Sequence, residues 1–76
     1  MSTITDLRDL FLADVGRVIS GEVEVTEFRR SVITTIAKRY SASIPCATTG
    51  YNTVLGMYLR DHPEHRELLY TQETVD

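Results

Sequence analysis

The sequence predicts an all-α domain with three main helices and a short C-terminal helix, the second and third forming a helix-turn-helix. Apolar residues recur every three or four positions in three long segments. Capping and helix-ending residues separate these segments. The length of 76 residues suits one domain. We therefore expect a single helical domain over residues 1–70 and a flexible tail over residues 71–76.

The first helix is expected to begin at Ser2 or Thr3, whose hydroxyl can cap it, and to end just before Gly21. Its apolar stripe consists of Ile4, Leu7, Phe11, Val15 and Val18. Asp14 falls inside this stripe, and a buried unpaired charge is costly. We therefore expect Asp14 to pair with Arg29 of the second helix, or each to find another polar partner at the rim.

The second helix is expected over residues 27–40, with Thr26 as its N-cap. Glu27 then lies in the first turn, where the helix dipole favours a negative charge. The inner face is predicted to consist of Phe28, Val32, Ile33, Ile36, Ala37 and Tyr40. Arg29 falls inside this apolar arc, and the opposite face is polar.

The third helix is expected over residues 45–61, capped by Ser43. Pro45 lies in its first turn, where a missing N–H costs nothing. The inner face is predicted to consist of Ala47, Tyr51, Val54, Leu55 and Tyr58. Residues 64–70 are expected to add one or two further turns.

The junction of the second and third helices predicts the helix-turn-helix. Such a motif needs a small residue where its helices cross, here Ala37, and a small apolar residue facing it, here Ala47. It also needs a tight turn between the helices, here at Ser41. We expect both alanines to be buried at the crossing. In this register the outward-pointing residues of the third helix and its cap are Ser43, Pro45, Thr48, Thr49 and Asn52.

Charge is segregated along the chain. Residues 28–60 contain no Asp or Glu and have a local charge of +5, whereas residues 1–27 and residues 61–76 each sum to −4. A surface that lacks carboxylates usually meets an anionic partner. The basic residues of this stretch are Arg29, Arg30, Lys38, Arg39 and Arg60.

Two kinds of partner fit this surface. Asn52 can bond adenine at two points and Thr can contact a thymine methyl, which favours a DNA-binding regulator, dimeric because one small module supplies little contact. However, the exposed start of the third helix carries no Arg or Lys to hold phosphates, and the acidic flanks would repel long DNA. We therefore favour an acidic protein surface. The predicted partner-binding residues are Arg29, Arg30, Lys38, Arg39, Thr48, Thr49, Asn52, Thr53 and Arg60.

Catalytic and metal-binding functions are not expected. Cys46 lies near a helix start, but no His or Asp lies nearby in sequence to activate it. His62 and His65 are interrupted by Pro63, which favours exposed histidines at a helix end over metal ligands. With no phosphate-binding loop or catalytic carboxylate pair, the sequence predicts no catalytic residue, no metal and no cofactor.

A cytoplasmic location is expected. The single cysteine excludes an internal disulfide, which favours a reducing compartment. No apolar run approaches the length of a membrane span, and the N-terminal residues do not resemble a signal peptide. No membrane partner is therefore predicted.

Residues 43–55 resemble a segment of small phage-encoded transcription regulators. Ser43, Ala47, Tyr51 and Asn52 occur at the spacing found in their helix-turn-helix-like half, and the likeness covers about residues 26–60. In size and layout the chain is similar to the short proteins with which lytic phages bind host RNA polymerase, blocking initiation or promoting antitermination. The resemblance implies a helical phage protein that regulates transcription by protein contact, and it transfers no binding residue.

Overall fold

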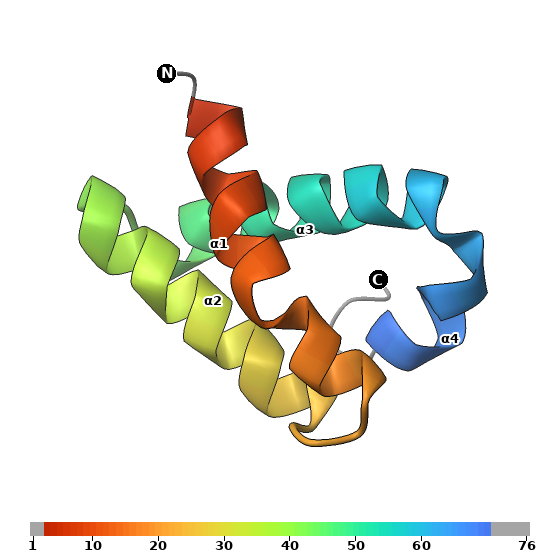
Figure 1. The fold of residues 1–76 in the computed structure, drawn as a ribbon. Helices are drawn as coiled ribbons and strands as arrows, with labels where there is room; N and C mark the ends of the chain where they lie inside the picture. Colours follow the sequence, from red (N-terminus) through yellow and green to blue (C-terminus); the bar gives the residue numbers. More distant parts are fainter. Residues whose placement is uncertain (1–2, 71–76) are drawn as a thin grey trace.

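Every secondary-structure element of the computed structural model is helical over residues 3–70, the part of the chain that the structure describes (Figure 1). The long helices are α1 (Thr3–Ile19), α2 (Val25–Tyr40) and α3 (Ile44–Asp61). A single turn of 3-10 helix, η1 (Pro63–His65), leads into the short α4 (Arg66–Leu69). The all-α prediction is confirmed. The predicted flexible tail at residues 71–76 lies outside the described residues.

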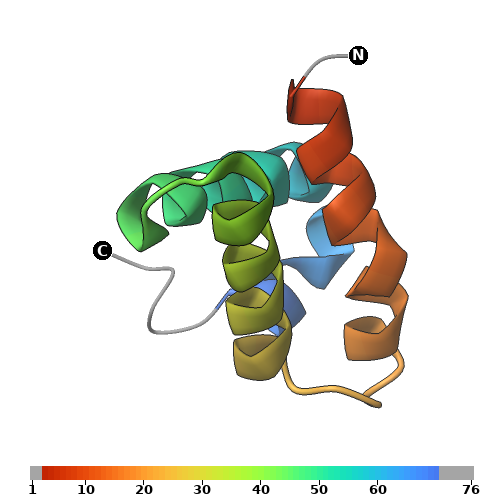
Figure 2. The same ribbon diagram turned by 90° about the vertical axis from the view of Figure 1, so that its left-hand side faces the viewer.

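The three long helices pack against one another. α2 and α3 cross at a steep angle in both views, and α1 packs against both of them (Figures 1 and 2). The contact between α2 and α3 is the most extensive, and α4 turns back to reach α1. Each long helix therefore contributes one face to a shared core and leaves the other to solvent.

Aromatic side chains from all three long helices form the centre of the core. The ring of Phe11, which is fully buried, lies 5.2 Å from that of Phe28, 5.7 Å from Tyr51 and 5.3 Å from Tyr58, between centroids. Such tilted and edge-on contacts are favourable beyond the area they bury. The surrounding buried residues are Leu7, Val15, Val18, Val32, Ile33, Ile36, Ala47, Val54, Leu55, Leu59 and Leu69.

The predicted inner faces are largely confirmed, with two exceptions at helix ends. Ile4 and Tyr40 are each 38% exposed. Ile4 lies in the first turn of α1, at the end of the helix and away from the centre of the core. Tyr40 ends α2 and turns its hydroxyl to donate to the carboxylate of Asp6 in α1. The periodic pattern also missed Leu59, which is buried one turn beyond Leu55.

The start of α2 differs from the prediction. The helix begins at Val25, with Glu24 as its N-cap residue in an extended conformation, so the predicted Thr26 cap is wrong. The Glu24 carbonyl accepts the first helical bond from the Phe28 N–H at 3.0 Å. The Val25 side chain packs against the core. This contact favours a helix that begins at Val25 rather than after Thr26.

The turn from α2 to α3 follows local chemistry. Ser41 takes a left-handed conformation with φ 52°, and its N–H bonds to the Ala37 carbonyl, which closes the end of α2. Ser43 is the predicted N-cap of α3, and its side chain accepts a bond from the Cys46 N–H at 3.3 Å. Pro45 lies in the first turn as predicted. This short turn sets the direction in which α3 leaves α2.

Candidate partner-binding surface

The outer face of α3 is rich in threonine, and its hydroxyls are already engaged. Thr49, Asn52 and Thr53 are exposed and Thr48 is half-buried. The hydroxyls of Thr48, Thr49 and Thr53 donate to the carbonyl one turn earlier, at 2.8, 3.2 and 2.9 Å. Because each proton is used within the helix, these side chains offer methyl groups and acceptor oxygens to a partner rather than donors.

This surface also carries no charge. The sequence has no Asp, Glu, Lys or Arg between Arg39 and Arg60, so α3 reaches its last turn without a charged residue. Ile44, at the start of the helix, is 56% exposed. We call this surface the uncharged face of α3; it consists of Ile44, Pro45, Thr48, Thr49, Asn52 and Thr53. Depletion of charged residues is typical of the core of a protein–protein interface.

The five predicted basic residues have different surroundings: four are exposed, and Arg29 is half-buried. Arg30, Lys38 and Arg60 are exposed, on α2 and at the last turn of α3. Arg39 instead contacts α1, where its Nη1 lies 2.5 Å from the Asp6 Oδ1. The bonds from Arg39 and from the Tyr40 hydroxyl hold the pKa of Asp6 below its usual value. The charge of Arg39 is therefore balanced within the molecule, and this side chain joins α2 to α1.

Arg29 lies against the core rather than in the open. It is half-buried, and its guanidinium carbon lies 5.8 Å from the centroid of the Tyr51 ring. Burial raises the pKa of Tyr51 to about 12. The Tyr51 hydroxyl has no hydrogen-bond partner among the described residues. Both side chains thus belong to the junction of α2 and α3, beneath the uncharged face.

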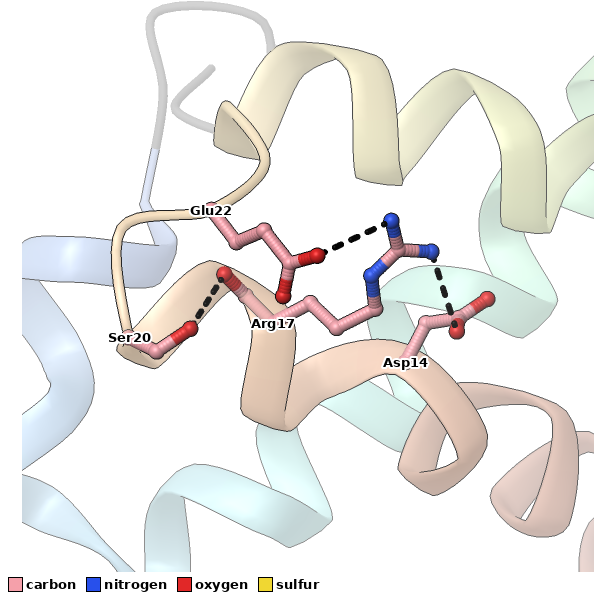
Figure 3. A network of polar contacts seen from close by, with 4 residues as sticks. All are labelled: Asp14, Arg17, Ser20 and Glu22. Carbon is pink, nitrogen blue, oxygen red and sulfur yellow. Dashed lines mark hydrogen bonds and ion pairs between the residues drawn. The ribbon is translucent and has the colours of Figure 1, made fainter.

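Asp14 does not pair with Arg29; it follows the predicted alternative of another polar partner at the rim, because it turns to Arg17 of its own helix. Arg17 lies between two carboxylates, with Nη1 3.8 Å from Asp14 Oδ1 and Nη2 3.5 Å from Glu22 Oε1 (Figure 3). The Ser20 hydroxyl donates to the Arg17 carbonyl at 3.1 Å. All four side chains are exposed, so these contacts shape the connector before α2 and contribute little stability.

A cluster at the end of α3 was missed by sequence reasoning. The His65 Nδ1 lies 2.9 Å from the Tyr58 hydroxyl, and the His62 ring stacks on the Tyr58 ring with 4.6 Å between centroids. The Glu64 Oε2 lies 3.6 Å from His62 Nδ1 and 4.0 Å from His65 Nε2. A bond to its own backbone N–H is the main cause that lowers the pKa of Glu64. Pro63 does not separate the histidines; it starts the tight turn that gathers them.

Comparison with known proteins gives no relative from which a function could be transferred. No protein-family model matches the chain, and neither curated proteins nor solved structures show a significant match. Among residues 3–70, no helix combines the length and the apolar character that crossing a membrane requires.

Proposed function

We propose that this protein is a small regulator of the phage-encoded type, which binds a host protein and thereby inhibits or redirects transcription. Host RNA polymerase is the proposed partner, and this choice follows the resemblance of residues 43–55 to small phage regulators. The observation that carries the protein-binding proposal is the uncharged face of α3, which is exposed but lacks the charges that normally cover a solvent-facing helix.

Within this proposal α2 and α3 act as a helix-turn-helix. The left-handed Ser41 and the capped start of α3 support this reading, because they provide a tight turn followed by a well-defined helix. Ala47 is 1% exposed, and Ala37 is half-buried against the core. Small residues on both helices allow close crossing and leave the uncharged face directed outward.

A protein partner fits this surface better than DNA does. Most contacts that hold a protein on DNA go to phosphates, and Arg and Lys supply many of them. The first turns of α3 have neither residue, and Arg39 is engaged with Asp6. Arg30, Lys38 and Arg60 are exposed outside the uncharged face, where their charges would steer the approach of an acidic protein surface.

A sequence-specific DNA-binding regulator is the second candidate function. The observation that favours it is the exposed Asn52, one turn beyond the half-buried Thr48 and the exposed Thr49, on a helix that follows a tight turn. In a major groove, Asn52 would bond adenine and the threonine methyls would contact thymine. Such a regulator would act as a dimer on two half-sites.

A capture experiment with nuclease distinguishes the two functions. Immobilised protein is exposed to bacterial lysate with and without nuclease, and binding to purified RNA polymerase is then measured by biolayer interferometry. We expect capture that resists nuclease. Thr49→Glu and Thr53→Glu should weaken binding at least about tenfold, mainly through faster dissociation. Ala13→Glu, on the exposed side of α1, is the matched control and should leave binding unchanged.

Association rates and affinity for duplex DNA also distinguish the two functions. Arg30→Gln and Lys38→Gln should slow association with the protein partner, because charges at a rim mainly steer encounter. Duplex DNA should bind more weakly than about 1 µM at physiological salt, the range of non-specific contact. Nanomolar binding of one DNA sequence by the purified protein, relaxed by Asn52→Ala, would overturn the protein-binding proposal in favour of the second function.

A further inference from the structure

We infer that the junction between α3 and α4 is a binding site for a divalent transition-metal ion, with Zn²⁺ as the expected occupant. The ligands are His62, Glu64 and His65. The site lies at the opposite end of α3 from its Ser43 cap, and it does not depend on the function proposed above.

The backbone places these side chains together. Pro63 starts the 3-10 turn η1, and the His65 N–H bonds to the His62 carbonyl at 3.0 Å. Because a 3-10 helix has about three residues per turn, residues i and i+3 lie on the same edge. His62 and His65 therefore share an edge, with Glu64 beside them, and Tyr58 lies one α-helical turn before His62.

The ligand atoms are close enough for a shared ion. One ligand atom from each side chain can be chosen so that all three lie within 4.8 Å of one another. The Glu64 Oε2 is 3.6 Å from His62 Nδ1 and 4.0 Å from His65 Nε2. Zinc bonds of about 2.0–2.2 Å place the donor atoms of a tetrahedral site roughly 3.3–3.6 Å apart. Closure thus requires side-chain rotation and no change of fold.

One ligand is already held in place. The Nδ1 of His65 bonds to the Tyr58 hydroxyl at 2.9 Å, and the His65 side chain is 20% exposed. When Nδ1 carries the proton and the hydroxyl accepts it, the lone pair of Nε2 is available on the side that Glu64 approaches. Metal-binding histidines usually have their second nitrogen fixed by such a partner, which sets the tautomer and the ring direction.

The other two ligands are free to turn toward this fixed histidine. The His62 and His65 rings are nearly parallel, at 19° with 5.6 Å between centroids, so His62 must rotate to direct its Nδ1 lone pair at the ion. The side chains of His62 and Glu64 are 46% and 63% exposed, which leaves room for rotation. Binding would exchange the stacking of His62 on Tyr58 for a metal bond.

The ligand chemistry favours a transition-metal ion such as Zn²⁺ over Mg²⁺ and Ca²⁺. Two imidazole nitrogens and one carboxylate form a set used by zinc sites that keep a fourth position for water or another donor. Imidazole suits Zn²⁺, Ni²⁺ and Cu²⁺, whereas Mg²⁺ and Ca²⁺ prefer oxygen ligands. An ion here would tie η1 to α3 and so steady α4, whose Leu69 is fully buried in the core.

Titration of the full chain with zinc chloride tests the site. Isothermal titration calorimetry should show saturable binding of one ion per chain, and the melting temperature should rise with zinc concentration because only the folded chain gathers the ligands. Magnesium chloride at the same concentration should produce neither effect. Failure to detect saturable zinc binding, or equal binding of magnesium, would overturn the inference.

Variants assign the ion to these residues. His62→Gln and His65→Ala should each remove saturable binding, and Tyr58→Phe should weaken it about tenfold or more by releasing His65. Glu67→Gln and Cys46→Ser, which change nearby or alternative ligands outside the cluster, should bind zinc as the parent does. Melting in the absence of metal shows whether each variant is folded. Because His62→Gln changes an exposed side chain, it still tests the site if His65→Ala does not fold. Unchanged affinity in His62→Gln would place the ion elsewhere and refute the site.

Discussion

The two faces of α3 differ in what holds their side chains. On the inner face, Tyr51, Val54 and Leu55 are 0–2% exposed and contribute to the core shared with α1 and α2. On the outer face, the hydroxyls of Thr49 and Thr53 bond to carbonyls of α3 itself. Burial of apolar area supplies stability, whereas exposed polar contacts contribute little. One helix therefore both holds the fold and presents a surface whose side chains can be replaced without unfolding the protein.

The largest expected difference between the faces comes from deleting a core side chain. Leu55→Ala removes a side chain that is 1% exposed and should lower the free energy of unfolding by about 2–5 kcal/mol. Thr53→Ala on the outer face should change it by less than about 0.5 kcal/mol. Urea unfolding followed by far-UV circular dichroism measures both. Equal losses in the two variants would contradict the assignment of the faces.

The crossing of α2 and α3 gives the next largest effect. Ala47 is 1% exposed, so Ala47→Leu should overpack the crossing and destabilise the protein by about 1–3 kcal/mol. Ala37 is only half-buried, so Ala37→Leu should cost less, since the larger side chain can extend toward solvent. The urea concentrations at which the two variants are half unfolded can be compared, and Ala47→Leu should have the lower value. A larger loss at Ala37 would mean that the helices cross elsewhere.

The inner faces could be predicted because the buried face of a helix produces a regular spacing of apolar residues in the sequence. Apolar residues every three or four positions located Phe11, Phe28 and Tyr51, and the Ser43 cap followed from a hydroxyl placed before a proline. Ser41 was expected to form the tight turn, and its left-handed conformation agrees with that expectation. These features depend on neighbours within a few positions, which the sequence displays directly.

Three other features were not predicted from the sequence, and only the first of them is a contact between distant segments. Arg39 was assigned to a partner, yet it pairs with Asp6 of α1, 33 positions away in sequence. Asp14 and Arg29 both interrupt apolar arcs, which predicts either a pair or separate polar partners at the rim; Asp14 pairs with Arg17, three positions along the same helix. Pro63 lies between the two histidines and indicated that they do not form a cluster. The three-residue period of a 3-10 turn was the signal that could have revealed it.

Two glycines of α3 differ in their surroundings, and their replacement should have smaller effects on stability. Gly56 is exposed, and an added Cβ would meet nothing within 4 Å, so Gly56→Ala should stabilise the helix by about 0.5–1 kcal/mol. At Gly50 the added Cβ would lie 3.1 Å from Leu7 Cδ1, so α1 must yield slightly. Gly50→Ala should therefore gain less than Gly56→Ala or destabilise the protein. Thermal melts compare them, and an equal gain at both positions would argue against close packing of α1 at Gly50.

The smallest expected effect concerns the polar contact outside α3, between Asp6 and the end of α2. Bonds from Arg39 and Tyr40 lower the pKa of Asp6 from its ordinary value of 3.8. A carboxyl whose pKa is lower in the folded state contributes stability that is present above the unfolded value and is lost as the pH falls through the folded value. The bond to Asp6 raises the pKa of Tyr40 above 10.0. The stability that this hydroxyl contributes is therefore fully present below pH 10.0 and is lost as the pH rises through the pKa of the folded state.

Urea unfolding as a function of pH tests this contact. Near neutral pH the parent should be slightly more stable than Asp6→Asn, and the difference should disappear in acid, where the Asp6 carboxyl of the parent is protonated. Asp9→Asn removes an exposed carboxylate of the same helix and controls for the loss of one negative charge. Both partners of the contact are partly exposed to water, so the loss should be smaller than any from the inner face of α3. A loss in Asp6→Asn as large as that in Leu55→Ala would show that this polar contact, rather than apolar burial, holds α1 in place.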